Sequence, residues 1–138
     1  MVNDYLDYST TKFLEELYDM YEWQYSITLT ARGNQVSYAD MKEQMQKFTK
    51  KLPYPTSWML FLCVNREEDV FTHPQPKRPH CHGALITTTS PEQLHELLKF
   101  NNHMIKPFTG DTAVTGRTKW RDYILGHAIR DTYDIHFE

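Results

Sequence analysis

The order in which strand-like and helix-like segments follow one another is the feature that most constrains the fold. Segments whose apolar residues have strand periodicity alternate along the chain with segments whose apolar residues have helical spacing. In chain order they predict a strand within 23–30 (YSITLT), a helix over 38–52, strands over 57–66 and 80–88, a helix that opens at 90–92, short strand-like pieces over 104–117 and a final helix over 119–130. This βαββαβ-like order predicts an α+β fold, in which helices pack on one face of an antiparallel sheet and the other face is open.

Length and charge distribution predict one domain with an acidic first segment. A chain of 138 residues suffices for a single packed core, so residues 1–138 are expected to form one domain. Residues 1–22 hold six acidic residues and one lysine, and an amphipathic helix is expected over Ser9–Glu22. We interpret residues 1–22 as an acidic helical N-terminal extension, which docks either on the core or on a second subunit.

Two kinds of protein are excluded at this stage. There is neither an apolar run of about 18 residues, as a membrane span requires, nor a charged-then-apolar leader. Cys63 and Cys81 both lie in apolar strand-like stretches, which is typical of buried, reduced thiols. We therefore expect an intracellular protein that does not associate with a membrane.

The stretch PHCHGALI places His80 and His82 on either side of a small apolar residue at the start of a predicted strand. Side chains alternate between the faces of a strand, so these two imidazoles are expected on one face, roughly 6.6 Å apart along the strand. Both rings could then bind one divalent metal ion, with a third ligand from a neighbouring element. The alternative is a chance pairing, since the chain has seven histidines.

The final predicted helix carries a tyrosine on a polar stripe. At about 100° per residue, Lys119, Gly126, His127 and Arg130 all lie near Tyr123, and apolar residues make the opposite face. Beside a metal site Tyr123 is a candidate nucleophile, because a phenol attacks well only when a base or a cation favours its phenolate. The alternative is an ordinary tyrosine on an amphipathic surface.

Basic residues flank these candidates, although the net charge of −3 argues against a general nucleic-acid-binding protein. Lys77 and Arg78 precede the histidines, and Arg117 and Lys119 precede Tyr123. Positive charge at these places would attract phosphate groups.

Three motifs in this order, YSITLT, PHCHGALI and WRDYILGHAIRD, resemble those of rolling-circle replication initiators (Rep) of the HUH endonuclease superfamily, of the single-tyrosine type. In that family the motifs are a core strand, a His-hydrophobic-His strand and a helix that bears the nucleophilic tyrosine. The resemblance covers about residues 24–134 and leaves out the acidic helix.

The resemblance implies a site-specific endonuclease that nicks and rejoins single-stranded DNA at a replication origin. His80 and His82, with Glu67 or Glu68, would hold Mn²⁺ or Mg²⁺ against the scissile phosphate. Tyr123 would attack it and leave a 5′-phosphotyrosine and a 3′-hydroxyl that primes replication. Lys77, Arg78, Arg117 and Lys119 would bind the DNA. Which of the two glutamates is the ligand stays open, because a one-residue register slip exchanges their faces.

The resemblance also implies partners and a location. No Walker motif is present, so a separate helicase is expected. With one nucleophilic tyrosine only, strand transfer would be completed by a second subunit, which favours a homodimer, or by a hydroxyl other than a second tyrosine. The protein would work in the cytoplasm of a host cell, encoded by a plasmid or a virus. The origin sequence cannot be read from the chain, because base readout depends on loop geometry.

One departure from the family concerns the third motif. Members commonly have Tyr-x-x-Lys, and here Gly126 stands at the position of the lysine. We expect His127 or Arg130 to take over the task of orienting the phosphate or balancing the phenolate. The alternatives are a single-tyrosine transposase or relaxase-like enzyme of the same superfamily, or a non-catalytic single-strand binder with the RNA-recognition fold.

Overall fold

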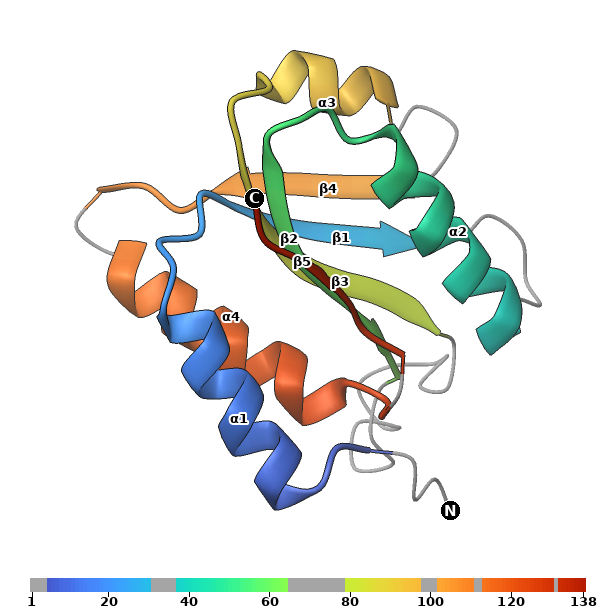
Figure 1. Ribbon diagram of the computed structural model, residues 1–138, viewed down its shortest axis with the longest axis vertical. Coiled ribbons are helices and arrows are strands. Elements are labelled where there is room, and N and C mark those ends of the chain that lie inside the picture. Colours follow the sequence, from blue (N-terminus) through green and yellow to red (C-terminus); the bar gives the residue numbers. More distant parts are fainter. Residues whose placement is uncertain (1–4, 31–36, 65–78, 98–101, 111–112, 131) are drawn as a thin grey trace.

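The computed structural model describes residues 5–30, 37–64, 79–97, 102–110, 113–130 and 132–138, with a five-stranded sheet at their centre (Figure 1). The strands are β1 (Tyr25–Thr30), β2 (Thr56–Cys63), β3 (His80–Thr87), β4 (Asn102–Pro107) and β5 (Asp134–His136). They lie in the order β4-β1-β3-β2-β5, and neighbours run antiparallel. The helices of the described part are α1 (Tyr8–Asp19), α2 (Tyr38–Lys51), α3 (Pro91–Leu97) and α4 (Ala113–His127). The predicted α+β class with an antiparallel sheet is therefore confirmed.

Helices α2 and α3 cover one face of the sheet. Helix α2 begins after Ser37, whose side chain accepts a hydrogen bond from the backbone N–H of Asp40 (3.0 Å), as an N-cap residue does. Its apolar residues recur at helical spacing and are buried against alternate residues of the strands. This core holds Ile27, Leu29, Met41, Met45, Phe48, Leu60, Leu62, Leu85 and Leu94, among others.

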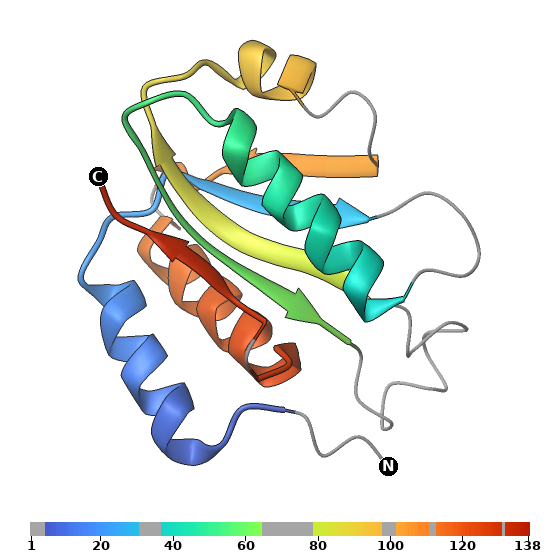
Figure 2. The same cartoon turned by 45° about the vertical axis from the view of Figure 1, so that its right-hand side comes forward.

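Helices α1 and α4 pack on the opposite face, so the prediction that helices cover one face only is wrong. Figure 2 shows α1 and α4 on one side of the sheet and α2 on the other. The reason lies in β2, where Met59 and Phe61 belong to the core under α1 and α4, and Leu60 and Leu62 to the core under α2. A strand that is apolar at consecutive positions exposes apolar surface on both faces, and both faces must then be covered.

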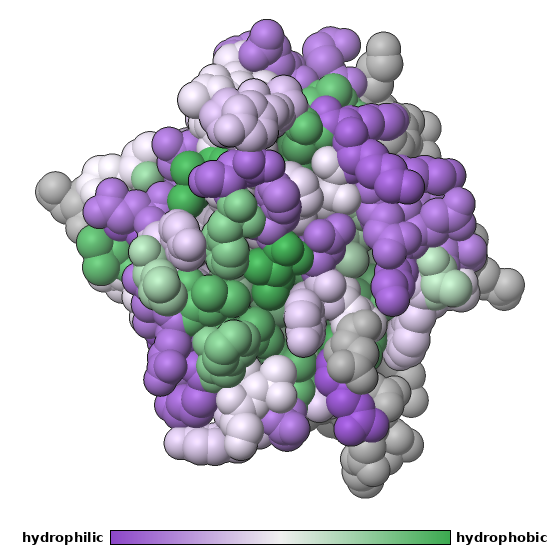
Figure 3. All heavy atoms as spheres, viewed as in Figure 1, coloured by the Kyte–Doolittle hydropathy of each residue, from purple (hydrophilic) through white to green (hydrophobic). Residues whose placement is uncertain are grey.

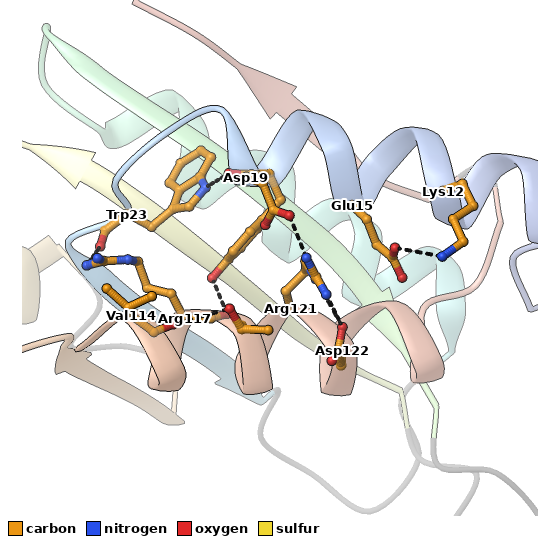
Figure 4. A network of polar contacts seen from close by, with 10 residues as sticks. Lys12, Glu15, Asp19, Trp23, Val114, Arg117, Arg121 and Asp122 are labelled. Atoms are coloured by element: carbon orange, nitrogen blue, oxygen red, sulfur yellow. Dashed lines mark hydrogen bonds and ion pairs between the residues drawn. The ribbon is translucent and has the colours of Figure 1, made fainter. Parts of the chain in front are cut away.

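Helix α1 is held against α4 by a set of polar contacts (Figure 4). The Tyr18 hydroxyl donates to the carbonyl oxygen of Arg117 (2.9 Å), and Nη1 of Arg121 donates to Oδ2 of Asp19 (2.5 Å). The Trp23 indole donates to the carbonyl oxygen of Tyr18 (2.8 Å). Helix α1 therefore docks on the core of the same chain, which is one of the two interpretations of the acidic segment. The expected homodimer stays a prediction.

An apolar region lies at the surface between α1, α4 and β5, and hydrophilic side chains cover α2 (Figure 3). Phe13 and Met20 of α1 are 63% and 71% exposed, and the rings of Tyr21 and Phe137 stack with their centroids 4.4 Å apart. None of the helices in the described ranges is long and apolar enough to cross a membrane. Cys63 and Cys81 are buried free thiols, as expected.

The C-terminal part differs most from the prediction. Helix α4 begins at Ala113 instead of Lys119. The sequence does not predict its first turns (AVTGRT) as helix, because β-branched residues and a glycine favour strands or loops by themselves. It ends at His127 instead of Arg130, because the backbone then pairs with other segments: the N–H of Ile129 donates to the carbonyl oxygen of Leu62 (2.9 Å), and Ala128 forms a bridge with Cys63. Strand β5 follows and was not predicted.

Candidate active site

The two histidines of β3 lie together on the face of the sheet that carries α4. Their ring centroids are 4.5 Å apart and the rings meet nearly at right angles. His82 is only 6% exposed and His80 is half-buried. The predicted placement on one face is confirmed, and it follows from the alternation of side chains along a strand.

One ring nitrogen of His82 has a hydrogen-bond partner among the described residues, and the other is buried without one. Its Nδ1 forms a hydrogen bond of 3.0 Å with Oγ1 of Thr28, its register partner on β1. Its Nε2 is buried, without a hydrogen-bond partner among the described residues. Buried polar atoms in proteins are nearly always paired, so this nitrogen is suited to a ligand. Burial, together with the neighbouring His80 and His127, lowers the pKa of His82 to about 3. The ring is therefore neutral at pH 7, which is the form that binds metals.

Helix α4 brings Tyr123 to these histidines. The centroid of the Tyr123 ring is 5.4 Å from that of His82 and 4.6 Å from that of His127, one turn further along the helix. Tyr123 is 41% exposed, so part of its side chain is open to solvent. Residues about forty positions apart in the sequence thus form one cluster, which we call the His–Tyr cluster: His80, His82, Tyr123 and His127.

Each nitrogen of His127 has a definite role in this arrangement. Its Nδ1 lies 2.8 Å from the backbone oxygen of Tyr123. Since a carbonyl oxygen only accepts, Nδ1–H is the donor, and the neutral ring carries its lone pair on Nε2. This nitrogen is therefore able to accept a proton beside the phenol of Tyr123.

Trp120 lies against the His–Tyr cluster, so its predicted place among the apolar residues on the face opposite Tyr123 is wrong. Its indole N–H donates to the carbonyl oxygen of Gly83 in β3 (2.8 Å), which ties α4 to the histidine strand. Its ring stacks on that of Tyr123 (5.7 Å between centroids, 12° between planes) and meets the His82 ring edge-on at 5.0 Å. The signal in the sequence is the spacing of three residues between Trp120 and Tyr123, which places both on neighbouring parts of one helix face.

The remaining candidates are distributed differently. Lys119 is exposed and lines a pocket beside Tyr123. The Arg117 guanidinium donates to the carbonyl oxygen of Trp23 (3.5 Å), on the side of α1. Arg130 lies beyond the end of α4, so the expectation that it continues the tyrosine stripe is wrong. Hydrogen bonds from Thr10 lower the pKa of Asp7, and the charge of Arg130 lowers it further by a smaller amount.

Four of the predicted site residues cannot be placed. Glu67, Glu68, Lys77 and Arg78 lie outside the described residues. Within the described ranges, no group of three or more His, Cys, Asp and Glu side chains is arranged to hold a metal ion. His80 and His82 therefore supply two ligands at most, and the buried, unpaired Nε2 of His82 is the observation that fits a metal.

Gly126, which stands where the resembling motif commonly has a lysine, faces away from the cluster. It lines a groove between α1 and α4 together with Leu6, Thr11 and Lys12. A Cβ atom at Gly126 would meet nothing within 4 Å. The described structure therefore does not require a glycine at this position for steric reasons.

Comparisons with known proteins add no relative. No protein-family model, no curated protein and no solved structure matches the chain. The proposal below therefore rests on the motifs in the sequence and on the geometry of the His–Tyr cluster.

Proposed function

We propose that this protein is a replication initiator that nicks and rejoins single-stranded DNA by metal-dependent transesterification, with Tyr123 as the nucleophile. The observation that carries the proposal is the His–Tyr cluster, in which a tyrosine from α4 meets a histidine pair from β3 beside a third histidine. An exposed phenol next to imidazole rings is a suitable arrangement for covalent catalysis on a phosphodiester. The partner is a single strand of DNA at an origin.

In the proposed reaction the phenol oxygen of Tyr123 attacks the scissile phosphorus in line. A bond forms between this oxygen and phosphorus, and the bond from phosphorus to the 3′ oxygen breaks. The phenol proton passes to Nε2 of His127, and the departing 3′ oxygen takes up a proton from water to become a free hydroxyl. Attack of a DNA hydroxyl on the phosphotyrosine reverses these steps and rejoins a strand.

His80 and His82 would hold the metal ion, with Nε2 of His82 as one ligand atom. Mn²⁺ or Mg²⁺, when bound there, would polarise the scissile phosphate as a Lewis acid. The third ligand is expected from Glu67 or Glu68. Thr28 orients the ring of His82, and Nε2 presents its lone pair to a ligand in the tautomer in which Nδ1–H donates to Oγ1 of Thr28.

The DNA would approach over the part of the sheet that α4 leaves uncovered. Lys119 is exposed at the edge of the cluster, and Lys106 is exposed on β4, opposite Ser26 of β1. These cations could contact phosphates on either side of Tyr123. Arg117 is removed from the proposed DNA contacts, since its guanidinium is turned towards α1 and Trp23; Lys77 and Arg78 stay predictions.

The polarity of the covalent link tests the proposal. Single-stranded DNA from a random pool is labelled at its 5′ or its 3′ end, incubated with Mn²⁺ and separated by denaturing electrophoresis. The 5′-labelled fragment is expected to run free with a 3′-hydroxyl, the 3′-labelled fragment to stay on the protein, and EDTA to prevent both. If the protein bound the single-stranded DNA but cleaved neither the 5′-labelled nor the 3′-labelled strand, this would instead indicate a non-catalytic single-strand binder.

Thr28→Val should weaken the site without disturbing the sheet, because valine has nearly the same shape as threonine and lacks only the hydroxyl. The loss of the bond to Nδ1 of His82 is expected to lower the Mn²⁺ affinity and the nicking rate by roughly 10- to 100-fold, as for other residues that orient a metal-binding histidine. Thr28→Ser, which keeps the hydroxyl, should restore most of both. Equal Mn²⁺ titration curves for all three proteins would rule out this role.

His127→Ala should slow nicking by about 100-fold, within the range that general bases contribute. The reason is that the proton acceptor beside Tyr123 is lost while both histidines of β3 remain. His95→Ala is the matched control, because His95 is an exposed histidine on α3. Single-turnover rates as a function of pH measure the effect, and a rate of His127→Ala equal to that of His95→Ala would contradict the assignment.

A further inference from the structure

A pocket opens beside the His–Tyr cluster, and Tyr123 forms part of its wall. It has a volume of about 410 Å³, and its lining residues come from β1, the segment that follows β4, and α4. Its lining consists of Ser26, Phe108, Gly116, Lys119, Trp120 and Tyr123. The volume falls in the range of pockets that hold small organic groups.

Three aromatic residues, Phe108, Trp120 and Tyr123, belong to the lining. Trp120 is held by its hydrogen bond to the carbonyl oxygen of Gly83 and stacks nearly parallel on Tyr123. Phe108 is half-buried, and its backbone N–H donates to the carbonyl oxygen of Gln24 (2.9 Å). Aromatic rings offer flat apolar surfaces, and these suit a flat, conjugated ligand.

Gly116 keeps the pocket open. A Cβ atom at this position would lie 3.8 Å from Cδ1 of Phe108, which is ordinary van der Waals contact, so a longer side chain would enter the space between them. Glycine is disfavoured inside a helix, and here it falls within α4. The pocket therefore depends on the absence of a side chain at one helical position.

The polar groups around the pocket fit a nucleotide better than a purely apolar molecule. Lys119 belongs to the lining and has an exposed side chain. Lys106 is exposed on β4, opposite the lining residue Ser26 of β1. The Ser26 hydroxyl donates to the carbonyl oxygen of Lys106 (3.3 Å) and keeps lone pairs that can accept a hydrogen bond from a base edge. An aromatic slot with cations at its edge has the chemistry of a site for one base and its phosphates.

We propose that this pocket holds a nucleobase next to the scissile phosphate and so selects the base at one position of the strand. The inference rests on the proposed function, because Tyr123 is at once part of the pocket wall and the proposed nucleophile. Single strands would thus be positioned by one base that binds against the aromatic lining of the pocket.

The test compares two helix glycines by their effect on base selection, without any cleavage. A random pool of single-stranded DNA is bound in EDTA by the wild type, Gly116→Leu and Gly126→Leu, and the bound strands are sequenced. Leucine at position 116 would fill the pocket, and at position 126 it meets open space on the side of α1. Circular dichroism and thermal unfolding check that both variants are folded, and Phe108→Ala supplies a second change to the pocket.

The wild type and Gly126→Leu are expected to enrich one base at one position by about tenfold, and Gly116→Leu and Phe108→Ala to lose that preference. The proposal is overturned if folded Gly116→Leu keeps the wild-type preference at every position, or if the wild type enriches no base at all. Failure of the proposed function would look different: the base preference would depend on Gly116, but no covalent adduct would form with Mn²⁺.

Discussion

Replacement of Tyr123 by phenylalanine is expected to reduce the nicking rate by about a thousandfold or more, as the loss of a nucleophile does in other covalent enzymes. The phenyl ring can keep the stacking on Trp120 and the edge contact with His82, so only the attacking oxygen is removed. Affinity for single-stranded DNA, measured by fluorescence anisotropy in EDTA, should therefore stay within a few-fold of the wild type.

Tyr133→Phe is the matched control for this change. Tyr133 is 44% exposed, similar to Tyr123, but its ring lies against Phe61 (6.0 Å between centroids) and just before β5, beyond the end of α4. Its loss should leave the nicking rate unchanged. If Tyr133→Phe abolished nicking and Tyr123→Phe did not, the nucleophile would be assigned to the wrong tyrosine.

Gly83→Ala is expected to have the largest effect on stability. Gly83 lies in β3, directly between the two neighbouring strands, and a Cβ atom there would overlap the carbonyl oxygen of Met59 and Cδ2 of Leu60, and would lie 2.9 Å from Cα of Leu60. Two of these atoms belong to the backbone, so rotation of a side chain cannot relieve the clash. We expect a loss of about 3 kcal/mol or more in the free energy of unfolding, measured by urea denaturation.

The glycines of α4 are the controls for this prediction. A Cβ atom at Gly116 or Gly126 meets ordinary contact or open space. Gly116→Ala and Gly126→Ala should each raise the free energy of unfolding by up to about 1 kcal/mol, because alanine is the better helix former. A Gly83→Ala protein as stable as the wild type would contradict the close packing of β3 against β2.

The fold class and the histidine pair could be predicted from the sequence because both depend on short-range periodicity. The alternation of side chains alone placed His80 and His82 on one face, and the apolar spacing of Met41, Met45 and Phe48 predicted α2 to within a residue at its end. The same reasoning missed the cover on the second face, although the consecutive apolar residues of β2 carry that information.

Contacts between distant segments were beyond such reasoning. The end of α4 is set by the pairing of Ala128 and Ile129 with other segments, which removes Arg130 from the helix, and no local pattern encodes it. The bond between Thr28 and His82 depends on the register of β1 against β3, since a shift of one residue would turn Thr28 to the other face. The expectation that Tyr123 lies by the histidines came from the resemblance of the motifs, not from periodicity.

The most direct test of the central claim is the site of the covalent link. The protein is incubated with Mn²⁺ and the pool of single-stranded DNA, digested with nuclease and protease, and its peptides are analysed by mass spectrometry. We predict nucleotide phosphate on the peptide that contains Tyr123, at its phenol oxygen, and none when EDTA is present. Nucleotides on another residue, or unmodified peptides from protein that binds the DNA, would contradict the account.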